Sequence, residues 1–198
     1  MLAPDQVYQL LRNLTSPVVA ITSTRGAERN GMIIDSAIRA SIVPTIPRMA
    51  IFIHKFNYSH DLIYDTGVFG LHLLRTDQYD LIRHLGFQSR RSIDKLATVP
   101  HRAGTLRVPV LDECYAHFEC RVVNAMDTGS STCFLGEVEE TGFGAAAAPR
   151  GEVMTAGYFR AHLPPDWKPD YERLLKEAQR HAEAASRRIT YGGWKSQP

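Results

Sequence analysis

Runs of residues with alternating hydrophobic and polar character recur along the chain and predict a set of short β-strands. In the clearest run, Val68 to Leu74, every second residue would point to the same side of a sheet. Other runs are rich in β-branched residues, which favour strands. The predicted strands are Pro17 to Thr24, Gly31 to Ala37, Arg48 to His54, Val68 to Leu74, His117 to Ala125 and Thr132 to Thr141.

Hydrophobic residues spaced three and four positions apart predict helices between these strands and near both ends of the chain. The strongest helical pattern is Pro169 to Arg188, where apolar residues form one stripe. The stripe comprises Tyr171, Leu174, Leu175, Ala178, His181, Ala182 and Ala185. Shorter helices are expected at Asp5 to Leu14, at Tyr58 to Asp65 with Gly67 as its C-cap, at Asp77 to Leu85 and at Arg91 to Leu96.

Turn signals join the strands directly rather than through helices. The polar segment Arg25 to Gly31 contains Asn-Gly, a hairpin signal, and Gly129-Ser130 separates the last two strands. Phe143 to Gly151 is expected to be a loop. Because strands outnumber helices and hairpin signals outnumber strand–helix–strand spacings, the pattern predicts a mainly β fold, an antiparallel barrel or sandwich.

Composition narrows the class of protein. The 198 residues, 44% of them hydrophobic, are enough for one sizeable core. The net charge of +2 indicates no strongly charged partner, so nucleic-acid binding is not expected. No apolar run approaches the roughly 20 residues of a membrane-spanning helix, and no signal peptide is visible.

Cysteine and histidine usage gives two further expectations. Cys114, Cys120 and Cys133 form no C-x-x-C pair, which is typical of free thiols in a reducing compartment, so we expect a cytoplasmic protein. Only His54 and His60 are close enough to suggest one site, and no carboxylate cluster completes it. We therefore expect no metal site.

The segment from Lys55 to Ile63 carries the most informative chemistry. The sequence holds no dinucleotide-binding glycine motif, P-loop, zinc-protease motif or serine elbow. Instead Lys55, Asn57 and Ser59 lead into a predicted helix, whose first N–H groups are unpaired and carry partial positive charge. This arrangement could hold a phosphate. The alternative interpretation is that Asn57 or Ser59 only caps the helix.

An ordered set of short motifs resembles the flavin reductase-like FMN-binding split-barrel family. The similarity covers about residues 10 to 142, and each piece is short. Its elements are Ser16-Pro17-Val18-Val19, Asn30-Gly31-Met32, Ser36, Ser41, Pro47, Lys55-x-Asn57-Tyr58-Ser59-His60, Ile63, Gly67-x-Phe69, Gly104 to Leu111, Glu119-Cys120-x-Val122 and Leu135-Gly136-Glu137-Val138.

The resemblance implies a six-stranded Greek-key split β-barrel with peripheral helices and a C-terminal helix. Residues 1–165 would form the FMN-binding domain and residues 166–198 the C-terminal helix and tail. The family dimerises with FMN partly at the dimer interface, so a homodimer is expected.

The resemblance also implies where FMN would lie. The isoalloxazine ring would run along Met32, Ile33, Ile34, Asp35 and Ser36. Ala37, Arg39 and Ser41 would border the ring and the ribityl chain, and Lys55, Asn57, Tyr58 and Ser59 would hold the phosphate. Arg39 could attract an anionic substrate or be an ordinary surface charge. No catalytic residue is named.

Three positions depart from the family pattern. Ile33 replaces a frequent threonine, and the usual double proline is absent around Pro47. Asp127 to Ser131 lacks the histidine common in members that use NADH. The leading hypothesis is an oxidoreductase that passes electrons from NADH or NADPH through FMN to a small acceptor. The alternatives are a non-catalytic flavin carrier or sensor, and a barrel without flavin that contacts other proteins. Tyr191 to Trp194 could cover a flavin or belong to a loose tail.

Overall fold

A computed structural model describes residues 3–14, 16–88, 93–144 and 151–190 of the chain. The strands are β1 (Val19–Arg25), β2 (Glu28–Ile34), β3 (Ala37–Arg39), β4 (Arg48–His54), β5 (Val68–Leu73), β6 (His101–Ala103), β7 (Pro109–Leu111), β8 (Ala116–Asp127) and β9 (Ser131–Phe143). The helices are α1 (Pro4–Leu11), α2 (Tyr58–Thr66), α3 (Tyr79–Gly86), α4 (Ala156–Ala161), a 3-10 turn at Pro165–Trp167, and α5 (Lys168–Ser186).

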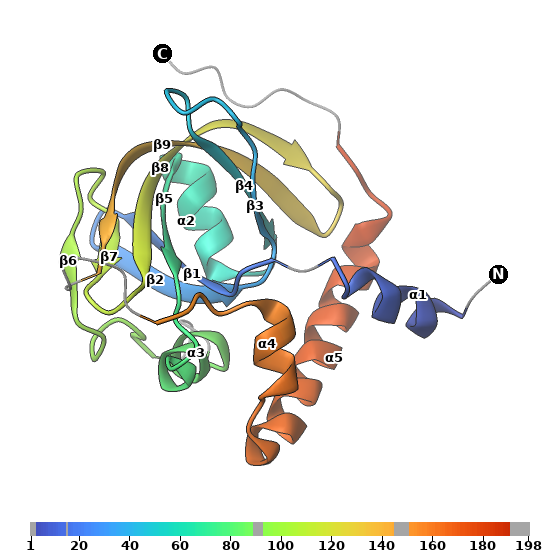
Figure 1. Ribbon diagram of the computed structural model, residues 1–198. Helices are drawn as coiled ribbons and strands as arrows, with labels where there is room; N and C mark the ends of the chain where they lie inside the picture. Colours follow the sequence, from blue (N-terminus) through green and yellow to red (C-terminus); the bar gives the residue numbers. More distant parts are fainter. Residues whose placement is uncertain (1–2, 15, 89–92, 145–150, 191–198) are drawn as a thin grey trace.

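Seven strands form one antiparallel sheet in the order β2-β1-β5-β8-β9-β4-β3. Figure 1 shows this sheet curling round on itself, as expected for a split barrel. All six strands predicted from sequence are present, so the mainly β fold class is confirmed. The expected strand Gly31 to Ala37 is broken at Asp35 and Ser36, and its last residue begins the short β3.

The first hairpin turns within the predicted segment Arg25 to Gly31, but not at Asn-Gly. Its turn is Gly26-Ala27, where Gly26 has a φ of 61°. Asn30 and Gly31 lie inside β2, paired with Ser23 and Thr22 of β1. A Cβ on Gly31 would lie 3.0 Å from a methyl carbon of Leu85. Gly31 is therefore a point of close packing against α3, not a turn residue.

Some shorter elements also differ from expectation. Of the helix expected at Arg91 to Leu96, the structure describes residues 93–96, and these form no helix. Turns run instead over residues 95–98. β6 and β7 form a separate two-stranded sheet that the pattern did not predict. α2 and α5 lie where expected, and Gly67 caps α2 with a φ of 69°. Tyr191 to Trp194 lies outside the described residues.

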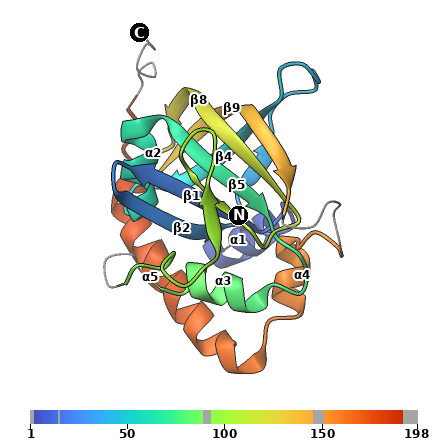
Figure 2. The same ribbon diagram turned by 90° about the vertical axis from the view of Figure 1, so that its left-hand side faces the viewer.

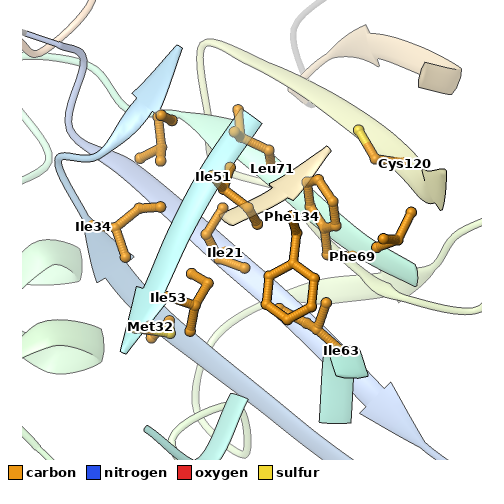
Figure 3. Packing of buried hydrophobic residues seen from close by; sticks show 13 residues of the cluster. Ile21, Met32, Ile34, Ile51, Ile53, Ile63, Phe69, Leu71, Cys120 and Phe134 are labelled. Carbon is orange, nitrogen blue, oxygen red and sulfur yellow. The ribbon is translucent and has the colours of Figure 1, made fainter. Parts of the chain in front are cut away.

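A hydrophobic core fills the curl of the sheet. Ile21, Ile51, Phe69 and Phe134 are fully buried there and point toward one another (Figure 3). Ile63 of α2 packs into this core and thereby holds the helix against the sheet. Cys120 belongs to the same core, and Cys114 is also buried.

The remaining helices gather on one side of the barrel. Figures 1 and 2 both place α3, α4 and α5 on this side. A second hydrophobic cluster joins the sheet to α3 and α4 through residues such as Val18, Ile82 and Phe159. α5 has no fully buried residue, although its predicted apolar stripe is its less exposed face. No helix in the described ranges has the length and apolar character needed to cross a membrane.

Candidate functional site

The main candidate site is a cleft between α5 and the outer side of β2. It consists of two cavities of about 480 and 700 Å³ that have Gly86, Phe87 and Leu174 in common. We call them the α1 chamber and the α2 chamber after the helix at the far end of each. Both volumes lie within the range of ligand sites, roughly 300–1,000 Å³.

Half of the residues predicted to bind FMN line this cleft. Ile33, Ile34 and Asp35 line the α1 chamber, and Met32, Asn57 and Tyr58 line the α2 chamber. These residues come from the end of β2 and the start of α2. The structure therefore brings the segment predicted to contact the ring and the segment predicted to contact the phosphate to one cleft.

The start of α2 lies at the α2 chamber, which Asn57 and Tyr58 line. Asn57 is its N-cap residue, and the Asn57 side chain makes no capping bond. The alternative that Asn57 merely caps the helix through its side chain is therefore not seen. The first N–H groups of a helix attract anions, because they are unpaired and lie at the positive end of the helix dipole. The Asn57 N–H itself donates to the carbonyl of His54 at 2.9 Å, so a phosphate here would be met by the N–H groups of Tyr58 and Ser59.

Ser59 supports this helix start from inside the protein. The Ser59 side chain is fully buried. Its Oγ accepts hydrogen bonds from Asn30 Nδ2 at 2.9 Å and from Ser23 Oγ at 3.1 Å. The Ser59 hydroxyl is thus engaged with β1 and β2, and it does not line either chamber of the cleft.

Asn30 leaves one polar atom unsatisfied beside the α2 chamber. Asn30 lines that chamber and is only 3% exposed, and its Oδ1 has no hydrogen-bond partner within the described ranges. Leaving such an acceptor buried and unpaired costs roughly 1–3 kcal/mol. A ligand hydroxyl bonded to this amide would recover that energy.

Lys55 faces a different part of the surface. The Lys55 ammonium donates to Asp127 Oδ1 at 2.7 Å, and both residues line a separate polar cavity of about 630 Å³. The bond from Lys55, helped by the backbone N–H of Gly129, holds the pKa of Asp127 well below its usual range. Lys55 therefore has a carboxylate partner and does not line the cleft.

The cations that do line the α2 chamber are Lys95 and Arg173. Lys95 is 3% exposed, and its Nζ donates to the carbonyl of Leu85 at 2.7 Å, near the end of α3. Arg173 comes from α5 and pairs with Asp170 and Glu177. Sequence reasoning missed both residues, because no local pattern shows that α3 and α5 meet the start of α2.

Aromatic rings line the cleft between the two chambers. His54 stacks on Phe56 with ring centres 5.1 Å apart, and Phe56 contacts His181 of α5 at 5.5 Å. Burial lowers the pKa of His54, so its imidazole is neutral near pH 7. Such rings offer flat apolar surfaces to a planar ligand.

The other predicted residues lie away from the cleft. Ser36 donates to the carbonyl of Phe52, and Ala37 is buried in the core. Arg39 is exposed, and Ser41 accepts a bond from the N–H of Val43 in the β3–β4 hairpin. Across the described ranges, no three His, Cys, Asp or Glu residues are grouped so that they could hold a metal ion.

Comparison with known proteins finds a matching family model, related sequences and solved structures with a similar fold. The model of the flavin reductase like domain matches residues 11–164. The high molecular weight rubredoxin of Moorella thermoacetica is 30% identical over 75% of this chain. The chain spans only 63% of that relative's length. The ferric-chelate reductase (NAD(P)H) of Archaeoglobus fulgidus is 26% identical over 72% of this chain and 81% of its own length.

A solved structure with a similar fold is the NADH:FAD oxidoreductase of Streptomyces globisporus C-1027. It superposes with a TM-score of 0.66 and 26% identity, covering 78% of this chain and 91% of that chain. The family match ends at residue 164, before α5 begins. One wall of the cleft is therefore built by residues outside the matched domain.

Proposed function

Because the chain belongs to the flavin reductase-like domain family, we propose that it is an FMN-dependent oxidoreductase. It would accept a hydride from NADH or NADPH and pass electrons to a small acceptor. The observation that carries the proposal is the cleft that joins the end of β2 to the start of α2. The relatives that reduce FAD or ferric chelates support the same class of reaction.

The cleft has the groups that FMN requires. Phe56 and Phe87 offer flat apolar rings in the α2 chamber, as a planar ligand needs, and the start of α2 lies in the same chamber, as a phosphate needs. The unpaired Asn30 Oδ1 lies in the α2 chamber, where a ribityl hydroxyl could donate to it. Bound FMN would supply the hydride and electron chemistry itself.

The chain's own residues would position the cofactor and exclude water. α5 covers the cleft with Leu174, Ala178 and His181, which removes one face of a bound ring from solvent. His54 is neutral and bonds to Ser131 through Nδ1, so it would add a polar edge without adding charge. No proton transfer by a side chain is needed for hydride transfer to a flavin.

We propose Lys95, rather than Lys55, as the lysine that binds the phosphate. Lys95→Met should weaken FMN binding by about 10–100-fold, because a charge-assisted bond to phosphate is lost. Lys55→Met should change it by less than about 3-fold, because Lys55 faces Asp127. Titrating each variant with FMN and with riboflavin checks this.

Riboflavin serves as the internal control, since it lacks the phosphate. Its affinity should stay the same in Lys95→Met, which also shows that the variant is folded. Equal losses for FMN and riboflavin would mean that Lys95 does not contact the phosphate. A large FMN-specific loss in Lys55→Met would instead assign the phosphate to Lys55, as the family resemblance implied.

The proposed activity is tested by mixing FMN-loaded protein with NADH or NADPH in the absence of oxygen. We expect the flavin absorbance band to bleach with at least one of them, because hydride transfer reduces the isoalloxazine ring. The turn at Asp127 to Ser131 has no histidine, and Asp127 there is engaged with Lys55. If neither donor bleaches the band, the chain is a flavin carrier or sensor instead.

We also propose that the chain forms a homodimer through the β3–β4 hairpin. Ile38, Ile42, Val43 and Ile46 are exposed there, with Ile42 at 84%. Such a cluster of exposed aliphatic side chains is typical of a contact surface.

The three cysteines are free, which supports a cytoplasmic location.

The homodimer predicts that Ile42→Asp lowers the molar mass measured by light scattering to that of one chain. A charge at the centre of an apolar contact would be desolvated without a partner. Leu10→Asp, at an exposed position on α1, is the matched control and should leave the dimer intact. A wild-type monomer, or an Ile42→Asp dimer, would refute this contact surface.

A further inference from the structure

Four of the residues that line the α1 chamber lie in parts of the chain that the family model does not match. Tyr8 comes from α1, before residue 11, and Tyr171, Leu174 and Leu175 come from α5, after residue 164. These residues meet Ile33, Ile34 and Asp35 at the end of β2. These four residues add to the chamber a wall that lies outside the matched domain.

Aromatic and aliphatic side chains together form the walls of the α1 chamber. Tyr8, Phe87, Phe159 and Tyr171 all line it. Tyr171 contacts Phe159 with ring centres 6.0 Å apart and Phe87 at 6.4 Å, so the three rings form one connected wall. Flat aromatic walls favour a ligand that is itself planar and aromatic.

Two arginines and one carboxylate face the same chamber. Arg160 is only 20% exposed, and its guanidinium donates to the carbonyl of Arg12 at 2.9 Å. Its other contact is a long one, 3.5 Å, to Asp35, whose side chain is 58% exposed. Arg12 lies close to the Tyr8 ring, at 5.9 Å. The chamber therefore carries one more positive than negative charge.

Tyr171 adds a hydrogen-bond donor to this charged group. Burial raises the pKa of the Tyr171 phenol, although nearby Arg12 acts in the opposite direction. The phenol is therefore protonated at neutral pH and can donate to an anionic oxygen. A guanidinium, a phenol and an aromatic wall in one chamber match an aromatic ring that carries one negative charge.

We propose that the α1 chamber binds a second ligand, a planar aromatic monoanion, next to the flavin held in the α2 chamber. This inference rests on the proposed function, because the second ligand would be the reactant that meets the flavin. Arg160 would hold its anionic group, and Tyr171 would stack on its ring or donate to it. α4 and α5 would thus determine which reactant the protein accepts.

Calorimetric titration with 4-hydroxybenzoate, an aromatic monoanion, tests this proposal. We expect saturable binding, at least 10-fold tighter than that of neutral 4-hydroxybenzamide. Arg160→Gln and Tyr171→Leu should each weaken binding of 4-hydroxybenzoate at least 10-fold. Lys176→Gln, on the exposed face of α5, is the control and should bind as the wild type does. Equal affinity for the neutral amide, or unchanged affinity in both chamber variants, would overturn the proposal.

Loss of folding must be separated from loss of the site, because Arg160 also bonds to Arg12 and Asp35. Leu175→Trp would fill the chamber without removing any charge, and should also abolish binding of 4-hydroxybenzoate. Each variant is compared with the wild type in thermal unfolding. Tight binding by a folded Leu175→Trp protein would place the probe elsewhere and refute the assignment.

The same titration on FMN-loaded and FMN-free protein separates this inference from the proposed function. The affinity for 4-hydroxybenzoate should be equal or higher with FMN bound. Competition between FMN and the probe would show one shared site and overturn the second-ligand proposal. A protein that binds the probe but no FMN would retain the chamber assignment while the proposed function fails.

Discussion

Replacing Ala178 with tryptophan should weaken FMN binding by more than about 100-fold, or about 2.7 kcal/mol. Ala178 is half-buried on the inner face of α5 and lines the α2 chamber between Leu174 and His181. An indole at this position would fill the space proposed for the ribityl chain and phosphate. The helix itself should remain formed, because α5 has no fully buried residue whose packing would be disturbed.

Fluorescence titration with FMN measures this effect, and a matched variant on the same helix controls for it. Ala184 lies on the exposed face of α5, so Ala184→Trp adds the same side chain away from the cleft. We expect Ala184→Trp to bind FMN as the wild type does. If Ala178→Trp binds FMN with wild-type affinity, the flavin does not lie beneath α5.

Replacing Phe69 with alanine should reduce the free energy of unfolding by about 3–5 kcal/mol. Phe69 is fully buried in β5 at the centre of the core, next to Phe134. Gly136 of β9 makes room for this ring, since a Cβ there would lie only 2.6 Å from Phe69 Cζ. The cavity left by the substitution cannot be closed by neighbouring strands that are hydrogen-bonded in place.

Urea unfolding followed by circular dichroism gives the change in the free energy of unfolding. Phe143→Ala is the matched control, because Phe143 is 46% exposed at the end of β9 and should cost less than about 1 kcal/mol. A loss below about 1 kcal/mol for Phe69→Ala would mean that the core is not packed around this ring. In Phe69→Ala, FMN binding should weaken only in proportion to the fraction of protein that is unfolded.

The sequence predicted the strands well because their signal is local. Alternation in Val68 to Leu74 reflects directly which side chains face the core, and the structure has β5 in the same place. The first turn lies inside the predicted segment Arg25 to Gly31, but Asn-Gly, a strong turn signal on its own, does not form it. Gly26, with its positive φ, makes the turn instead, while Gly31 is required by the approach of Leu85.

The site was predicted only in part, for a physical reason. Met32 to Asp35 and Asn57-Tyr58 could be identified because short motifs carry the resemblance, although their contact with FMN remains a prediction. The opposite wall comes from α5 and from the end of α3 with the segment after it, and no local pattern relates Lys95 or Ala178 to the start of α2. Likewise, the ion pair of Lys55 with Asp127 joins residues 72 positions apart.

The most direct test of flavin binding in this cleft is a titration of FMN fluorescence with the purified wild-type chain, with riboflavin titrated in parallel. The proposed site predicts quenching that saturates at one FMN per chain, and an affinity for riboflavin at least about 10-fold lower, because riboflavin lacks the phosphate held at the start of α2. FMN fluorescence that stays unchanged in a large excess of protein, or equal affinities for the two flavins, would contradict it.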